Sequence, residues 1–218
     1  MPNKPFVTLF SVISLDHKLA LGKTSHWLSA PALQPGLYQV AEIAQTIDYW
    51  IMTTAHSIQK VGISNDKIDV PFKLGQHYLI LLDTEGDLSG KTLVAASKTF
   101  SQVLVYSPQT YKASAFPNVT FVKIQNFNLK QIFAQLSTNF NVDYLTIQAD
   151  TDFNTAVFKA NVVDRYVLVQ LPIMVNDMRA PTIFWFNQIL ADWQTFQIQS
   201  IEPLLHSYLC ISYYGQKN

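Results

Sequence analysis

An alternation of short apolar runs with amphipathic segments of about ten residues constrains the fold of this chain more than any other feature. The apolar runs are rich in β-branched and aromatic residues, which favours strands, and the segments between them carry apolar residues at helical spacing. We expect strands at residues 6–14, 49–52, 77–82, 102–106, 119–124, 144–147 and 166–171, and helices at 37–46, 129–140 and 153–160. Strands separated by helices predict an α/β fold with a mostly parallel central sheet flanked by helices.

The C-terminal tail follows a different pattern. Residues 196–214 alternate and predict an antiparallel β-hairpin centred near Pro203, which would add edge strands to the sheet. Residues 58–73 are polar, with turn-forming residues throughout, and predict irregular structure. Because no linker separates two halves, we expect a single domain over residues 1–218.

Composition narrows the class of protein. The chain is 49% hydrophobic and 14% charged, with 15 basic and 15 acidic residues, so it has the core-forming content that a disordered chain lacks. The balanced charge gives no basic footprint for nucleic acid. Only Arg165 and Arg179 are available for bidentate phosphate contacts. The lone Cys210 excludes an intramolecular disulfide, so a cytoplasmic location is the simplest. We find no apolar window long enough to span a membrane and no signal peptide.

Ligand sites in open parallel sheets lie beyond the carboxyl ends of the strands. In this chain those ends are residues 14–18, 53–57, 107–110, 148–154 and 172–177. The chain has only 7 glycines and none of them lies in these ranges, which argues against a fold whose function needs several glycine-rich phosphate loops. The histidines and Cys210 show no metal-ligand spacing, so we expect no metal site.

These segments carry a family resemblance. Residues 4–8 (KPFVT) and 14–20 (SLDHKLA) resemble the opening RPYVTL…SLDGKIA of the reductase domain of riboflavin biosynthesis. Residues 25–29 (SHWLS) resemble its S-x-W-I-[ST], residues 82–88 (LDTEGDL) its VLD-x-x-G-x-L, and residues 162–164 its LVDE. Further matches, in order along the chain, fall on Asp48, Asn154, Pro172 and residues 180–182.

The resemblance implies a dihydrofolate-reductase-like fold and an NADPH-dependent reductase, commonly homodimeric, that acts on 5-amino-6-(5-phosphoribosylamino)uracil. It implies a pyrimidine or other small heterocyclic substrate, held beside the nicotinamide by Asp16 as the catalytic residue. The substrate-binding positions would be Ser14, Trp27 and Ser29, and the cofactor-binding positions Thr53, Thr54, Ser107, Ala149, Asp150 and Thr151.

Several positions depart from the family pattern. The three-glycine loop that would approach the cofactor diphosphate falls on Ala149-Asp150-Thr151, which contains no glycine. An alternative is that an acid, Asp152, caps the following helix and competes with phosphate for its N–H groups. The arginine expected before Asp48 is a small residue near Ala44, and the glutamate of VDE is Arg165.

Each candidate also has a structural reading. Asp16 is either a substrate ligand or a turn carboxylate, and His17 either a proton donor or a surface residue. Trp27 either stacks on a ring or fills the core, Ser29 either binds a ligand or caps a turn, and Ser107 either meets the cofactor or forms a Ser-Pro turn. Three functions therefore remain open: the NAD(P)H-dependent reductase, a non-catalytic homologue that has lost the dinucleotide site, and a same-fold reductase for another small heterocycle.

Overall fold

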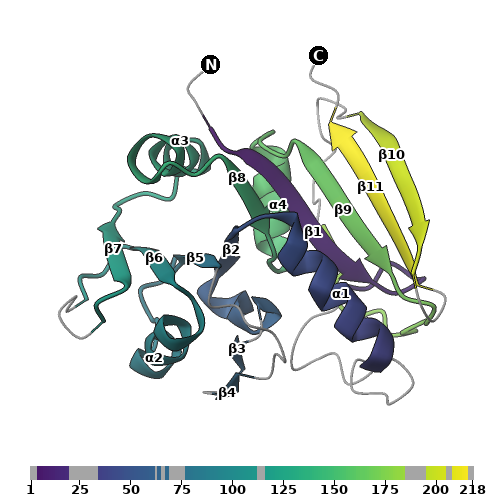
Figure 1. Cartoon of the computed structure of the whole chain (residues 1–218), viewed down its shortest axis with the longest axis horizontal. Coiled ribbons are helices and arrows are strands. Elements are labelled where there is room, and N and C mark those ends of the chain that lie inside the picture. The colour runs from purple at the N-terminus through teal and green to yellow at the C-terminus, as the bar shows by residue number, and fades with distance from the viewer. Residues whose placement is uncertain are drawn as a thin grey trace. The chain divides into compact units, whose positions relative to one another are not determined.

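The computed structural model describes residues 4–19, 34–61, 63–64, 67–68, 77–111, 116–184, 195–204 and 208–215. They divide into two compact units, one formed by Met1–Pro5 with Ile47–Ala149 and the other by Phe6–Thr46 with Asp150–Asn218. The expectation of a single domain over the whole chain stays a prediction. Each unit contains its own part of the sheet, and Figure 1 labels the elements in chain order.

The first unit is a parallel sheet in the order β8-β2-β5-β6-β7. Its strands are β2 (Trp50–Thr54), β5 (Tyr78–Leu82), β6 (Gln102–Ser107), β7 (Val119–Lys123) and β8 (Tyr144–Ile147). The helices α2 (Gly90–Thr99) and α3 (Leu129–Phe140) lie on opposite sides of these strands (Figure 1). Covering both faces explains why β5 and β6 are nearly continuous apolar runs.

The core of the first unit follows from that layering. One face of the strands, including Ile51, Leu81 and Val105, packs into a cluster with Leu93 and Ala96 of α2. The apolar residues Ile132, Phe133 and Leu136 recur at helical spacing on α3 and are buried, and the helix has the predicted bounds, which confirms it.

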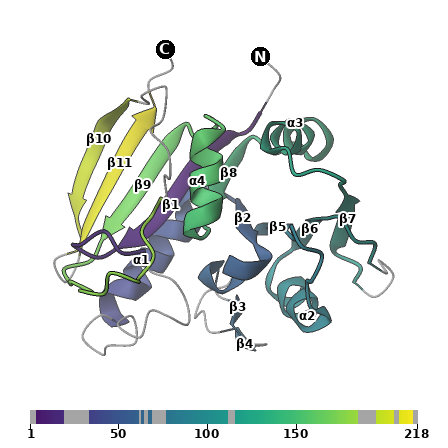
Figure 2. The same cartoon turned by 180° about the vertical axis from the view of Figure 1, so that it is seen from behind.

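The second unit is a mixed sheet in the order β10-β11-β9-β1. β1 (Phe6–Ile13) runs parallel to β9 (Arg165–Gln170), while β11 (Leu209–Gly215) is antiparallel to β9 and to β10 (Phe196–Pro203). The helices α1 (Gln34–Ile47) and α4 (Thr151–Lys159) lie on opposite sides of this sheet (Figures 1 and 2). The mostly parallel α/β sheet with a C-terminal antiparallel hairpin is therefore confirmed.

Three local expectations need correction. Helix α2 was not expected from the sequence, and it begins after Ser89, whose hydroxyl accepts from Thr92 N at 3.1 Å. Part of the segment expected to be irregular is ordered, as the 3-10 helix η3 (Ala55–Val61) and the short strands β3 (Ile63–Ser64) and β4 (Lys67–Ile68). Helix α4 starts two residues earlier than expected, which changes the identity of its cap.

Candidate functional site

The turn after β1 carries Asp16, the residue expected to be catalytic. Ser14 Oγ donates to the Asp16 carboxylate and accepts from Lys18 N at 3.0 Å, which closes the turn. Two backbone N–H groups from a distant segment also donate to Asp16: Val175 N at 3.0 Å and Asn176 N at 2.9 Å. These contacts resemble those of a turn carboxylate that binds backbone N–H groups. The N–H groups are not local, however, because they come from about 160 residues away in the chain.

These hydrogen bonds fix the protonation state of Asp16. The Ser14 hydroxyl, followed by the N–H groups of Val175 and Asn176, holds the pKa of the Asp16 carboxyl far below its usual range. Asp16 is therefore an anion throughout the physiological pH range and is unable to act as a general acid. It can still accept a hydrogen bond from a substrate N–H or hydroxyl. Its neighbour His17 is exposed and has a left-handed backbone with φ 58°.

The N-terminus of α4 carries three of the expected cofactor ligands. Asp150 is the N-cap, with its carboxylate accepting from Phe153 N at 2.9 Å. The predicted cap, Asp152, is wrong: it lies exposed in the first turn, so two carboxylates meet the positive end of the helix. Thr151 is buried and donates its hydroxyl to Thr182 O, and Ala149 is 1% exposed.

The carboxyl end of β2 carries Thr53 and Thr54, both buried. Thr54 Oγ1 accepts from Ser57 N at 3.2 Å and so starts η3. Thr53 Oγ1 has no hydrogen-bond partner within the described residues, and its side chain is 0% exposed. Of these two hydroxyls, Thr53 is the one left for a ligand, but it is closed off from solvent.

The carboxyl ends of β5 and β6 meet at Asp83, which is 0% exposed. Four donors converge on its carboxylate: Gly86 N at 3.0 Å, Asp87 N at 3.1 Å, Ser107 Oγ at 2.7 Å and Tyr111 OH at 2.6 Å. Ser107 Oγ also accepts from Gln109 N at 3.1 Å, so this hydroxyl both donates and accepts a hydrogen bond. Burial and the bond to Asp83 raise the pKa of Tyr111. This set binds the two strand ends to each other.

The residues at the N-terminus of α4 do not fit the diphosphate of a dinucleotide, because the Asp150 carboxylate already accepts from Phe153 N. In the other unit, taken by itself, the Ser107 hydroxyl donates to the buried Asp83 carboxylate. A phosphate at α4 would also lie against two fixed negative charges, those of Asp150 and Asp152.

Other expected positions fall in two groups. Trp27 and Ser29 lie outside the described residues. Arg165, where the family pattern has a glutamate, donates through Nε to Thr8 Oγ1 at 3.1 Å and lies 5.8 Å from the centre of the Phe6 ring. Asp48 accepts from the buried Thr146 hydroxyl at 2.6 Å, which identifies it as a positioning group between the starts of β2 and β8.

The structure also brings together a group that sequence spacing did not reveal. His56 Nε2 lies 3.5 Å from Glu85 Oε1, and ligand atoms of His56, Glu85 and Asp87 all lie within 4.8 Å of one another. All three are exposed, and they come from η3 and from the turn after β5. Only the pairing of β2 with β5 makes them neighbours, so a search by sequence spacing was unable to find them.

A mostly parallel sheet extended by a C-terminal antiparallel hairpin is the dihydrofolate-reductase-like α/β fold that the resemblance implies. The chain belongs to the RibD C-terminal domain family, whose model matches residues 5–207. This confirms the resemblance drawn from the sequence. No curated protein matches the chain in a sequence comparison.

Solved structures of riboflavin-pathway proteins share this fold. RibD of Acinetobacter baumannii aligns with a TM-score of 0.71 at 18% identity, covering 98% of this chain and 59% of that one. The diaminohydroxyphosphoribosylaminopyrimidine deaminase/5-amino-6-(5-phosphoribosylamino)uracil reductase of Thermotoga maritima aligns at 0.73 and 15%, covering 98% and 57%. The riboflavin biosynthesis reductase Rib7 of Saccharomyces cerevisiae aligns at 0.64 and 12%, covering 98% and 90%.

At these identities the likeness establishes the fold. The chain spans 59% and 57% of the lengths of the Acinetobacter and Thermotoga proteins. The Thermotoga and Saccharomyces proteins are named as reductases, so at the coarse level the chain has the fold of riboflavin-pathway reductases. Among the described helices, none has the length and apolar content needed to cross a membrane.

Proposed function

We propose that this chain keeps the reductase fold without the dinucleotide-dependent reaction, as a divergent, non-catalytic homologue. One observation carries the proposal: Asp150 occupies the N-terminus of α4 and accepts from Phe153 N at 2.9 Å, where the resemblance expects a glycine loop to admit the cofactor diphosphate. The Asp150 carboxylate thus takes the place at the helix N-terminus that a bound phosphate would occupy.

Repulsion between the two carboxylates and the diphosphate would weaken cofactor binding by a large factor. Two like charges 4 Å apart repel by about 1 kcal/mol in water and about 4 kcal/mol at an effective dielectric constant near 20. A diphosphate facing Asp150 and Asp152 meets several such pairs and gains no helix N–H that Asp150 already holds. Each 1.4 kcal/mol weakens binding about tenfold, so a site of micromolar affinity is reduced to the millimolar range or beyond.

The second candidate is the NADPH-dependent reductase itself, acting on 5-amino-6-(5-phosphoribosylamino)uracil. Membership of the family supports it, as does the retention of Asp16 as an ionised acceptor at the end of β1. The third, a reductase of another small heterocycle, is supported by the small side chain of Ala44 where the family places an arginine. In both, Asp16 would orient the substrate by accepting its N–H or hydroxyl, and a different group would donate the proton.

One titration separates the lead proposal from both reductases. We expect no change in thermal stability and no change in nicotinamide fluorescence when NADPH or NADH is added to millimolar concentration. A ligand at 100 times its Kd adds about 2.7 kcal/mol to the unfolding free energy, which is about 5–10 °C in Tm for a chain of this size. An upward shift of that size with NADPH would overturn the proposal.

A charge-neutral variant tests whether the carboxylates of Asp150 and Asp152 exclude the diphosphate. Asp150→Asn with Asp152→Asn keeps a capping side chain and removes both charges. We expect this variant to bind NADPH or pyrophosphate measurably more tightly than the parent, while the control Glu42→Gln, an exposed acid on α1, changes nothing. If neither the double variant nor the parent bound NADPH or pyrophosphate, the two carboxylates would not be what excludes the diphosphate. The homodimer and the cytoplasmic location stay predictions.

A further inference from the structure

A cavity of about 570 Å³ opens at the amino-terminal ends of β2, β5 and β8, and all its lining residues belong to the first unit. Trp50, Tyr78 and Tyr144 are the first residues of those three strands, and Tyr49 precedes β2. The cavity therefore lies at the opposite end of the strands from Thr53, Thr54 and Ser107. Its volume is within the range of small-molecule sites, which is about 300–1,000 Å³.

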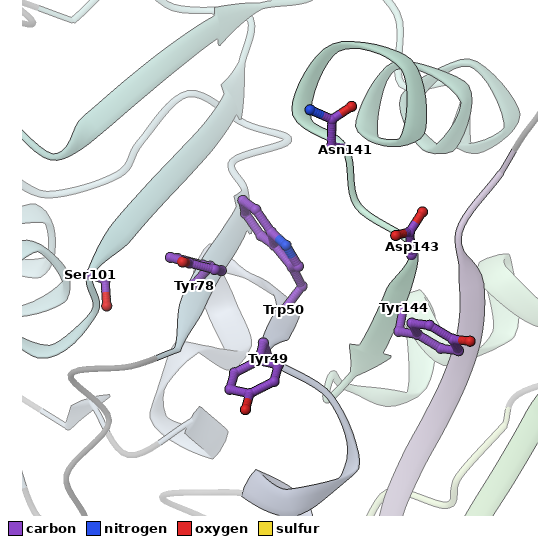
Figure 3. Close-up of a pocket in the computed structure, with 7 residues that line it drawn as sticks. All are labelled: Tyr49, Trp50, Tyr78, Ser101, Asn141, Asp143 and Tyr144. Carbon is purple, nitrogen blue, oxygen red and sulfur yellow. The ribbon is translucent and has the colours of Figure 1, made fainter.

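Four aromatic rings line this cavity (Figure 3). Trp50 and Tyr78 are partners in the β2–β5 register, and their ring centroids lie 4.6 Å apart with planes tilted by 41°. They form a continuous aromatic surface because neighbouring parallel strands bring the two side chains together. Tyr49 and Tyr144 are 66% and 61% exposed. Their exposed rings add aromatic surface to the wall of this cavity.

The described polar residues of the cavity lining are neutral or negatively charged. Among the lining residues that the structure describes, Asp143 alone is charged, and it is exposed. No basic side chain pairs with it within the described part of the chain. Asn141 ends α3 in a left-handed conformation with φ 52° and presents a neutral amide beside it (Figure 3). Aromatic rings carry negative potential on their faces, so the rings and the carboxylate favour the same kind of ligand.

We propose that this aromatic pocket binds a small organic cation that carries a methylated ammonium group. Tryptophan and tyrosine faces attract such a cation within about 6 Å of the ring centroid, and Asp143 supplies the counter-charge. The ligand is not an anion, because nothing in the lining neutralises one. The site is independent of the strand-end residues at Asp16 and Asp150, and it stands whether or not the chain binds a dinucleotide.

The decisive experiment compares two probes of the same shape and different charge. Choline carries a quaternary ammonium, and 3,3-dimethylbutan-1-ol is its neutral isostere. We expect isothermal titration calorimetry and saturation-transfer NMR to show choline binding at least tenfold more tightly than the isostere, and glucose, a neutral sugar, binding no better than the isostere. Equal affinity for choline and the isostere, preference for glucose, or no binding by choline would each overturn the proposal.

Variants locate the site. Asp143→Asn removes the only charge and is expected to weaken choline binding several-fold without changing the isostere, and Tyr144→Ala is expected to weaken both. Both side chains are exposed, so the variants should fold, which circular dichroism verifies. The matched control is Asp152→Asn, an exposed carboxylate on α4, which should leave choline binding unchanged. Unchanged choline affinity in Asp143→Asn would refute the assignment.

Discussion

Removing the carboxylate of Asp83 is expected to be among the most destabilising single changes at the strand ends. This side chain is fully buried and takes hydrogen bonds from four donors: Gly86 N, Asp87 N, Ser107 Oγ and Tyr111 OH. Asp83→Ala leaves all four without their acceptor. The two N–H groups lie in an exposed turn and can turn to water, while the Ser107 hydroxyl is 1% exposed and the Tyr111 hydroxyl partly buried.

The loss of unfolding free energy in Asp83→Ala is set mainly by these two hydroxyls. Hydrogen bonds to a charged group contribute about 1.5–3 kcal/mol each, so the loss at Ser107 and Tyr111 is roughly 3–6 kcal/mol. In a chain of this size 1 kcal/mol corresponds to about 2–4 °C in Tm, and Asp83→Ala should lower Tm by about 6–24 °C. Asp83→Asn keeps the shape and an acceptor for the N–H groups, and the hydroxyls can rotate to accept from its amide. We expect it to cost about 1–2 kcal/mol.

Urea unfolding followed by circular dichroism measures these differences, and hydrogen exchange of residues 83–91 reports the local effect. Ser107→Ala and Tyr111→Phe should each cost less than Asp83→Ala, and both together should approach it. An Asp83→Ala variant no less stable than Ser107→Ala alone would refute this role of the carboxylate. Unchanged stability together with weaker NADPH binding in Ser107→Ala would refute it as well, because the hydroxyl would then serve the cofactor.

Two further predictions concern turns at the strand ends. The folded-state pKa of Asp16 is lowered, so the contribution of Asp16 to stability is present above the unfolded pKa of about 3.9 and is lost as the pH falls from there toward the folded-state pKa. The Tm difference between the parent and Asp16→Asn should therefore shrink between pH 7 and pH 3. A Tm difference that stays constant over this range would contradict the prediction. Gly86 has φ 74°, so Gly86→Ala should cost about 1–2 kcal/mol in chemical denaturation, since its Cβ also forces the flexible Gln109 side chain to move. The control Gly90→Ala, at the start of α2 with nothing within 4 Å of the new Cβ, should be neutral or stabilising.

Most of the fold could be predicted from local sequence pattern. The bounds of α3 and β8 were predicted at 129–140 and 144–147, where the structure has them, because a clear apolar stripe and a short apolar run define each. Helix α2 was missed because two of its buried residues are Ala95 and Ala96, whose small side chains give a weak apolar stripe. Its cap, Ser89 followed by Thr92, is a signal that could have found it.

The strand-end chemistry was harder to predict because its partners are far apart in the chain. Asp16 was identified from its motif, but the donors at Val175 and Asn176 come from a segment with no regular pattern. The cap was assigned to Asp152 because the start of α4 was placed two residues late, and an N-cap depends on that register. The aromatic pocket was not predicted at all, since it needs the pairing of β2 with β5 and β8.

The scarcity of glycine acquires a physical meaning at these strand ends. A phosphate-binding loop leaves backbone N–H groups free so that a ligand can satisfy them, and glycine keeps the approach open. In this chain several strand-end donors are satisfied by carboxylates of the protein: Phe153 N by Asp150, Val175 N by Asp16, and the Ser107 hydroxyl by Asp83. Under the proposed function, the bonds to Asp150 and Asp83 stabilise the fold and occupy groups that the resemblance assigns to the cofactor. We therefore expect that binding a dinucleotide would require breaking native hydrogen bonds, so that stability and cofactor affinity oppose each other.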